Sequence, residues 1–119
     1  MSKRPVDLLL NDIRQSIDRI EQYIKNLLFD AFSEDQKSVD AVVRNLEIIG
    51  EVANRLPDEF KEKYSEIEWH KVVGLRHRIV HEYFGTDLEI IWQILHKDLP
   101  ELKGKIVQII NEAKFKDSF

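Results

Sequence analysis

The fold of this chain is decided by residues 39–56, which read VDAVVRNLEIIGEVANRL. An α-helix turns once every 3.6 residues, so side chains three or four positions apart share a face. Gly50 lies beside that face, where it weakens the helix but lets a neighbouring helix approach closely. The stretch therefore predicts an amphipathic helix that packs against other helices. Its apolar stripe consists of Val39, Val42, Val43, Leu46, Ile49, Ala53 and Leu56.

The segment before this stretch repeats the pattern. We expect a first helix from about Pro5 to Phe29, because proline fits the first turn, where its missing N–H costs nothing. Ser33 is the expected cap of the second helix, which ends near Leu56, before Pro57. The apolar stripe of the first helix contains Leu9, Ile13, Ile17, Ile20, Ile24 and Leu27 or Leu28.

The segment after Pro57 predicts a short helical turn over residues 58–64 and then a longer third helix. The third helix is expected to run from about Glu68 to Tyr83 and to end before Gly85.

A fourth helix should follow, with Thr86 or Asp87 as its cap. Pro100 should kink or restart this helix near Asp98, because proline has no N–H to donate within a helix. Its apolar stripe consists of Leu88, Ile91, Trp92, Leu95, Leu102, Ile106, Ile109 and Ile110.

Length and composition fit this plan. The chain has 119 residues, with only 4 glycines and 3 prolines, which leaves little room for the tight turns of a sandwich or barrel. No internal repeat or linker is visible, so residues 1–119 are expected to form a single domain. The sequence predicts an all-α protein: an up-and-down bundle of four main helices with a short extra helical turn, the last helix kinked near Pro100.

Charge and residue content exclude several classes of function. The formal net charge of -4 argues against bulk electrostatic coating of nucleic acid, so any RNA contact requires a local basic patch. The absence of cysteine excludes disulfides, thiolate metal sites and a cysteine nucleophile. No signal-peptide-like or membrane-spanning apolar run is present, so we expect a cytoplasmic protein without a membrane partner.

The segment from Arg76 to Tyr83, RHRIVHEY, concentrates chemically active side chains in about two turns of helix. Arginine binds phosphate through its planar fork of donors. Histidine exchanges protons near neutral pH. Arg76, His77 and His81 therefore point to chemistry on a phosphodiester.

A helical projection from Val72 raises the question of how these side chains meet. Arg76 falls about 40° from Val72, inside the sector expected to be buried, so it must pair with a carboxylate, bend to an edge or line a cleft. Glu47 and Glu51 are the candidate partners. Arg76 and His81 diverge by about 140° on a straight helix. A joint site then requires fraying near the end of the helix, the long reach of arginine, or two copies meeting across a dimer, which we favour.

Structural explanations compete with this reading. Arg76 could form a purely structural ion pair. His77 and His81 have the spacing of some metal-ligand pairs, but no Glu-x-x-His companion supports a metal site. Tyr83 could be an aromatic residue at the edge of the core with its hydroxyl in water.

The motif and its surroundings resemble the HEPN superfamily, and within it the HepT-like branch of toxin ribonucleases. The HEPN hallmark is an arginine, then a polar residue, then a histidine four to six residues beyond the arginine; Arg76, His77 and His81 match it. The HepT branch adds a tyrosine two residues later, which Tyr83 matches. Residues 44–51 (RNLEIIGE), the region of Trp69, residues 81–85 (HEYFG) and residues 98–102 (DLPEL) also resemble this branch.

This resemblance, which covers nearly the whole chain, implies a helical homodimer with a composite cleft that cleaves RNA without a metal or other cofactor. Arg76 and His81 would be catalytic, and His77 would support them. It also implies a toxin–antitoxin system in which a MntA-type nucleotidyltransferase antitoxin silences the toxin by AMPylation of Tyr83. Many HEPN-like bundles instead bind a nucleotide or a partner without catalysis, and that alternative stays open here.

Overall fold

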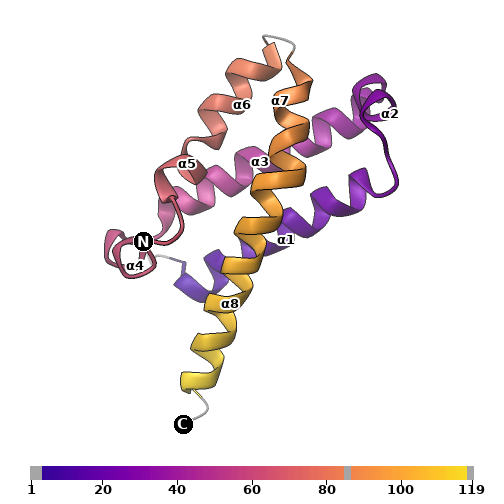
Figure 1. Cartoon of the computed structure of the whole chain (residues 1–119). Helices are drawn as coiled ribbons and strands as arrows, with labels where there is room; N and C mark the ends of the chain where they lie inside the picture. The colour runs from indigo at the N-terminus through magenta and orange to yellow at the C-terminus, as the bar shows by residue number, and fades with distance from the viewer. Residues whose placement is uncertain (1–3, 85–86, 118–119) are drawn as a thin grey trace.

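The computed structural model folds into four helical rods, residues 6–24, 36–55, 69–84 and 88–117, with two further short helices at residues 29–34 and 58–63 (Figure 1). The structure describes the backbone of residues 4–84 and 87–117, and the side chains of residues 4–79 and 87–113. The chain reverses direction from each rod to the next (Figure 1), and its described part contains only helices and loops. The predicted all-α bundle is therefore confirmed. The elements are α1 (Val6–Ile24), α2 (Phe29–Glu34), α3 (Gln36–Arg55), α4 (Asp58–Lys63), α5 (Trp69–Val73), α6 (Leu75–Phe84), α7 (Leu88–Gln93), the π-helix η1 (Ile94–Asp98) and α8 (Leu99–Asp117).

α3 is the central element, because it contacts α1, α2, α5 and α6. Its predicted apolar stripe is buried throughout, with Val42, Leu46 and Ile49 fully inaccessible to solvent. Fully burying one such aliphatic side chain contributes about 1.5–3 kcal/mol. α1 buries its own stripe in the same core, including Ile13 and Ile17. The periodicity of these two segments is therefore what holds the bundle together.

The predicted first helix is too long at its carboxyl end. α1 ends at Ile24, and Asn26 adopts a left-handed backbone conformation with φ 64°. Asparagine tolerates that conformation better than most residues, and a residue in it cannot continue a right-handed helix. Leu28, a candidate for the apolar stripe, is consequently 79% exposed.

The short helix α2 was not predicted and replaces the expected cap at Ser33. Ser33 lies inside α2, where its hydroxyl donates to the carbonyl of Asp30 at 3.0 Å. Asp35 occupies the N-cap position of α3 instead. α2 exists because Phe32 is fully buried against Trp92 of α7, with ring centroids 5.0 Å apart.

The third rod is divided at Gly74 into α5 and α6. It begins after Glu68 as predicted, and its helical backbone extends to Phe84. Two backbone hydrogen bonds span this break: the N–H of Gly74 donates to the carbonyl of His70, and the N–H of Arg78 donates to the carbonyl of Gly74, each at 3.0 Å.

The fourth rod confirms two predictions. Asp87 caps α7 by accepting a hydrogen bond from the Ile90 N–H at 3.4 Å, while Thr86 lies outside the described residues. The N–H of Leu99 donates to the carbonyl of Ile94, five residues back, so the rod passes through a π-helical turn and restarts as α8 immediately before Pro100. A proline ring clashes with the carbonyl four residues earlier, and the wider turn avoids that clash.

An ion cluster ties α8 to α1. Lys103 Nζ lies 2.8 Å from Asp18 Oδ1 and 2.9 Å from Glu21 Oε1, and these carboxylates raise the pKa of Lys103.

Among the residues that the structure describes, none of the helices has the length and hydropathy that a membrane span requires.

Candidate functional site

Gly50 lets α3 contact the helix that carries Arg76. A Cβ atom at this position would lie 3.2 Å from the backbone N of Arg76 and 3.2 Å from the carbonyl oxygen of Val73. It would also lie 3.3 Å from the carbonyl oxygen of Val72. Glycine therefore lets α3 touch the backbone of the α5–α6 junction, as the sequence predicted. This contact fixes the position of the Arg76 backbone along the axis of α3.

The Arg76 side chain leaves that contact toward solvent. Its Nη1 atom lies 3.6 Å from Glu51 Oε1, and 64% of the side chain is exposed. The predicted carboxylate partner is thus Glu51, not Glu47. The expectation that the Arg76 side chain lies in a buried sector is wrong, because this long side chain extends from the α3 contact to Glu51 and solvent.

This ion pair leaves the Arg76 guanidinium free for another anion. A separation of 3.6 Å is too long for a hydrogen bond. Exposed ion pairs contribute only about 0–1 kcal/mol. An arginine held so loosely keeps most of its five donors available.

Arg76 and His77 border an open depression of ≈ 750 Å³ between α3 and the α5–α6 junction. The His77 side chain is exposed. The depression carries two guanidinium groups and one carboxylate, so its described lining is net positive on a chain of net charge -4. It is the kind of local basic surface that RNA contact requires. Its lining residues are Gly50, Glu51, Asn54, Arg55, Val73, Arg76 and His77.

Two of the four predicted site residues have no described side chain. The backbone of His81 and Tyr83 belongs to α6, whereas their side chains lie outside the described residues. The backbone is helical to Phe84, so fraying near Tyr83 does not bring Arg76 and His81 together. The angle of about 140° between their positions around the helix axis therefore applies within α6. The structure thus joins Arg76 to His77 and leaves the placement of His81 a prediction.

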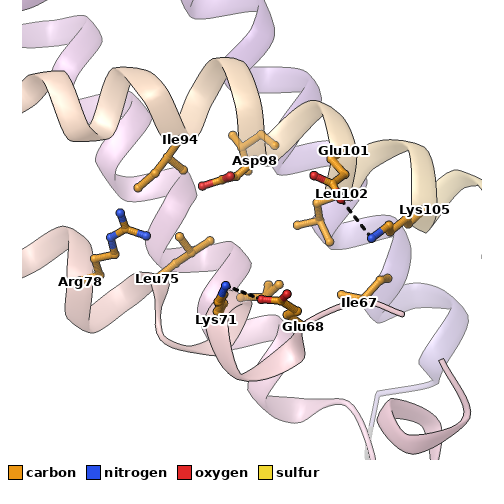
Figure 2. Close-up of a pocket in the computed structure, with 12 residues that line it drawn as sticks. Ile67, Glu68, Lys71, Leu75, Arg78, Ile94, Asp98, Glu101, Leu102 and Lys105 are labelled. Atoms are coloured by element: carbon orange, nitrogen blue, oxygen red, sulfur yellow. Dashed lines mark hydrogen bonds and ion pairs between the residues drawn. The ribbon is translucent and has the colours of Figure 1, made fainter. Parts of the chain in front are cut away.

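A second hollow of ≈ 290 Å³ lies between α5–α6 and η1–α8, and Figure 2 shows its lining. Its cations are matched by carboxylates: Lys71 pairs with Glu68, and Lys105 Nζ lies 3.2 Å from Glu101 Oε1. The hydrogen bond between Lys71 and Glu68 raises the pKa of Lys71 and lowers the pKa of Glu68. Such a balanced rim offers a polyanion less than the Arg76 depression does. Its charged residues are Lys71, Arg78 and Lys105 together with Glu68, Asp98 and Glu101.

Two polar residues of the depression, Asn54 and Arg55, escaped the sequence analysis. Asn54 and Arg55 lie in the last turns of α3, and both are exposed. Arg55 follows Glu51 by four positions, which places both on one face of the helix. Once Glu51 is known to contact Arg76, that spacing indicates Arg55. Among the described side chains, no group of three His, Asp or Glu could hold a metal ion.

Comparison with known proteins identifies the family. The family described as Ribonuclease HepT-like matches residues 13–109. The chain is 41% identical over 110 residues to a Methanocaldococcus jannaschii protein named "Gamma-glutamylcyclotransferase and putative RNase"; the match covers 92% of this chain and 50% of that protein.

A second relative has a comparable length. The "Probable ribonuclease HepT" of Thermococcus cleftensis is 38% identical over 100 residues, and the match covers 84% of this chain and 91% of that protein. No solved structure matches the chain. With the family matched over most of its length, this chain belongs to the ribonuclease HepT-like family.

Proposed function

We propose that this chain is a metal-independent endoribonuclease and the toxin component of a toxin–antitoxin system. The observation that carries the proposal is the exposed Arg76 guanidinium beside His77 in a basic depression. Membership of a family named for a ribonuclease supports RNA as the substrate.

The proposed reaction is an intramolecular transesterification. The ribose 2′-oxygen attacks the adjacent phosphorus while a general base takes its proton. The bond from phosphorus to the 5′-oxygen breaks, and a general acid protonates that oxygen. The products are a 2′,3′-cyclic phosphate and a free 5′-hydroxyl.

Each motif residue has a role in this reaction. His81 acts as general base or acid, a contribution of roughly 10²–10⁴-fold. Arg76 binds the phosphate and stabilises the charge that develops on its oxygens; loss of such a donor costs roughly 10²–10³-fold. His77 orients the phosphate or supplies the second proton-transfer group.

A homodimer interface completes the site in this proposal. Arg76 and His81 lie on different faces of α6, about 140° apart, so one copy presents them poorly to a single phosphate. Two copies related by a two-fold axis bring two α6 helices together. His81 of one copy can then act with Arg76 of the other.

Silencing is proposed to occur at Tyr83. A MntA-type nucleotidyltransferase antitoxin would transfer AMP from ATP: the phenol oxygen attacks the α-phosphorus, and pyrophosphate leaves. Residues 76 and 83 are seven positions apart on α6, so they share a face at a separation of about 10 Å. An added phosphodiester there brings negative charge toward Arg76 and competes with the RNA phosphate.

Cleavage of labelled RNA in EDTA tests the enzyme. Purified protein should cut RNA and leave a cyclic phosphate, whereas folded His81→Ala and an all-DNA substrate of the same sequence should show no cleavage. Equal cleavage of DNA would refute the 2′-hydroxyl mechanism. Binding of RNA or nucleotide without cleavage by unmodified protein would favour a non-catalytic binding module.

Intact mass tests the silencing step. Incubation with the antitoxin and ATP should add AMP to the wild-type chain and abolish cleavage, and Tyr83→Phe should acquire no AMP and stay active. Silencing of Tyr83→Phe to the wild-type extent would contradict the modification site.

A further inference from the structure

The last turns of α3 extend the depression beyond Arg76. Arg55 and Asn54 line it together with Arg76 and His77, although they come from a helix that carries no part of the RHRIVHEY motif. Arg55 makes no hydrogen bond or ion pair to another described side chain, so its guanidinium donors are available.

The relative placement of Arg55 and Arg76 follows from the contacts that Arg76 makes with α3. Gly50 holds the Arg76 backbone against α3, and Glu51 contacts the Arg76 guanidinium. Arg55 lies one turn further along the same face of α3, a rise of about 6 Å. The depression therefore carries two guanidinium groups: that of Arg76, from α6, which contacts Glu51, and that of Arg55, one turn beyond Glu51 on α3.

Successive cations match the repeating phosphates of a nucleic acid strand. Arginine binds phosphate in a bidentate manner and is weakly hydrated, which favours its use at such contacts. Asn54 adds a neutral amide donor and acceptor at the same rim.

We propose that Arg55 and Asn54 form a binding subsite for an RNA phosphate next to the scissile one. Arg55 donates to the oxygens of that phosphate, and Asn54 donates to the same group. The subsite positions the strand and takes no part in bond breaking. This inference rests on the proposed ribonuclease function, which it extends by a second contact to the substrate.

Arg55 also has a simpler explanation, which the test must separate. A cation in the last turn of a helix interacts favourably with the helix dipole. That role is served equally by lysine and does not involve RNA. Arg55→Lys therefore serves as a control for stability, and Arg19→Ala serves as a control for the loss of an exposed arginine, this one on α1.

RNA binding measured in a His81→Ala background tests the subsite without cleavage. Arg55→Ala should weaken the binding of a single-stranded RNA roughly tenfold, the loss expected for one hydrogen-bonded charged contact. The slope of log K against log salt should fall by about 0.7, as expected for one phosphate contact on a single strand. Arg55→Lys should retain that slope, and Arg19→Ala should leave the affinity unchanged. In the active protein, Arg55→Ala should raise KM more than it lowers kcat.

The outcomes distinguish this inference from the function beneath it. If the parent protein cleaves RNA and Arg55→Ala binds it with unchanged affinity and slope, the subsite is refuted and the ribonuclease proposal is unaffected. If Arg55→Ala loses affinity only in proportion to a lower melting temperature, Arg55 is structural and the subsite is again refuted. If the parent protein neither binds nor cleaves RNA, both proposals fail.

Discussion

Gly50→Ala tests how closely α3 and the motif-bearing helix approach. In a helix interior the change should stabilise the chain by about 1 kcal/mol, because alanine is the better helix former. The new methyl group, however, meets one backbone nitrogen and two backbone oxygens at 3.2–3.3 Å, which is closer than the 3.4–4 Å of ordinary van der Waals contact. Backbone atoms cannot rotate away as a side-chain tip can, so the α5–α6 junction must shift by a few tenths of an ångström.

The expected magnitudes decide whether Gly50→Ala stabilises or destabilises the chain. Inserting one extra methyl group into a packed site costs about 1–3 kcal/mol. That cost offsets or exceeds the gain in helix propensity, so Gly50→Ala should change the free energy of unfolding by between 0 and about 2 kcal/mol in the destabilising direction. The shift also displaces Arg76, so RNA cleavage should fall roughly tenfold, since misplacement by 1 Å can cost about 10²-fold.

Gly104→Ala is the matched control, because a Cβ atom at that helical position meets nothing within 4 Å. It should raise the free energy of unfolding by about 0.5–1 kcal/mol and leave cleavage unchanged. Denaturant unfolding of both variants, with the parent chain, measures the difference between them. If Gly50→Ala stabilises the chain as much as Gly104→Ala does, the close approach at Gly50 is refuted.

Three further changes test the charges and caps around the bundle. Glu51→Gln should alter the free energy of unfolding by less than about 1 kcal/mol, because the ion pair with Arg76 is exposed. The same change should tighten RNA binding at low salt but not at high salt, and equal effects on binding at both salt concentrations would contradict an electrostatic origin. Lys103→Met should lower stability by about 0.5–1 kcal/mol at neutral pH. Because the pKa of Lys103 is raised in the folded state, its contribution to stability should be complete below its unfolded-state pKa and should disappear as pH rises through its folded-state pKa. Thermal melts in which the parent chain stays more stable than Lys103→Met above that pH range would refute a stabilising ion cluster. Asp87→Ala should cost about 0.5–2 kcal/mol through loss of the α7 cap, and Asp87→Asn should recover most of it, as chemical denaturation would show.

The helices were predictable wherever one periodic face decides burial. The stripe from Val39 to Leu56 and the α1 stripe through Ile24 are buried as expected, because a core-facing helix leaves a regular pattern. The cap at Asp87 and the restart at Pro100 followed from local chemistry alone. These features need no knowledge of what lies across the bundle.

The misplaced features depend on backbone states and tertiary contacts. Asn26 ends α1 in a left-handed conformation that its sequence neighbours do not require. The long Arg76 side chain extends to Glu51 and solvent, and a projection of residue positions around the helix cannot show that reach. Arg55 becomes a candidate only after Glu51 is seen to contact Arg76.

The π-helical turn at residues 94–98 has a consequence for the length of the fourth rod. A hydrogen bond to the fifth residue back encloses one residue more than an α-helical turn does. The π-helical turn therefore acts as a one-residue insertion. The side chains of α7 and α8 face the directions that they would face in a continuous α-helix with that one residue removed. A chain that lacked one residue within this turn would still direct Ile91 and Ile106 into the core. The rod can thus absorb a change in length at this point, above Pro100, without rotating the packing surface of either end.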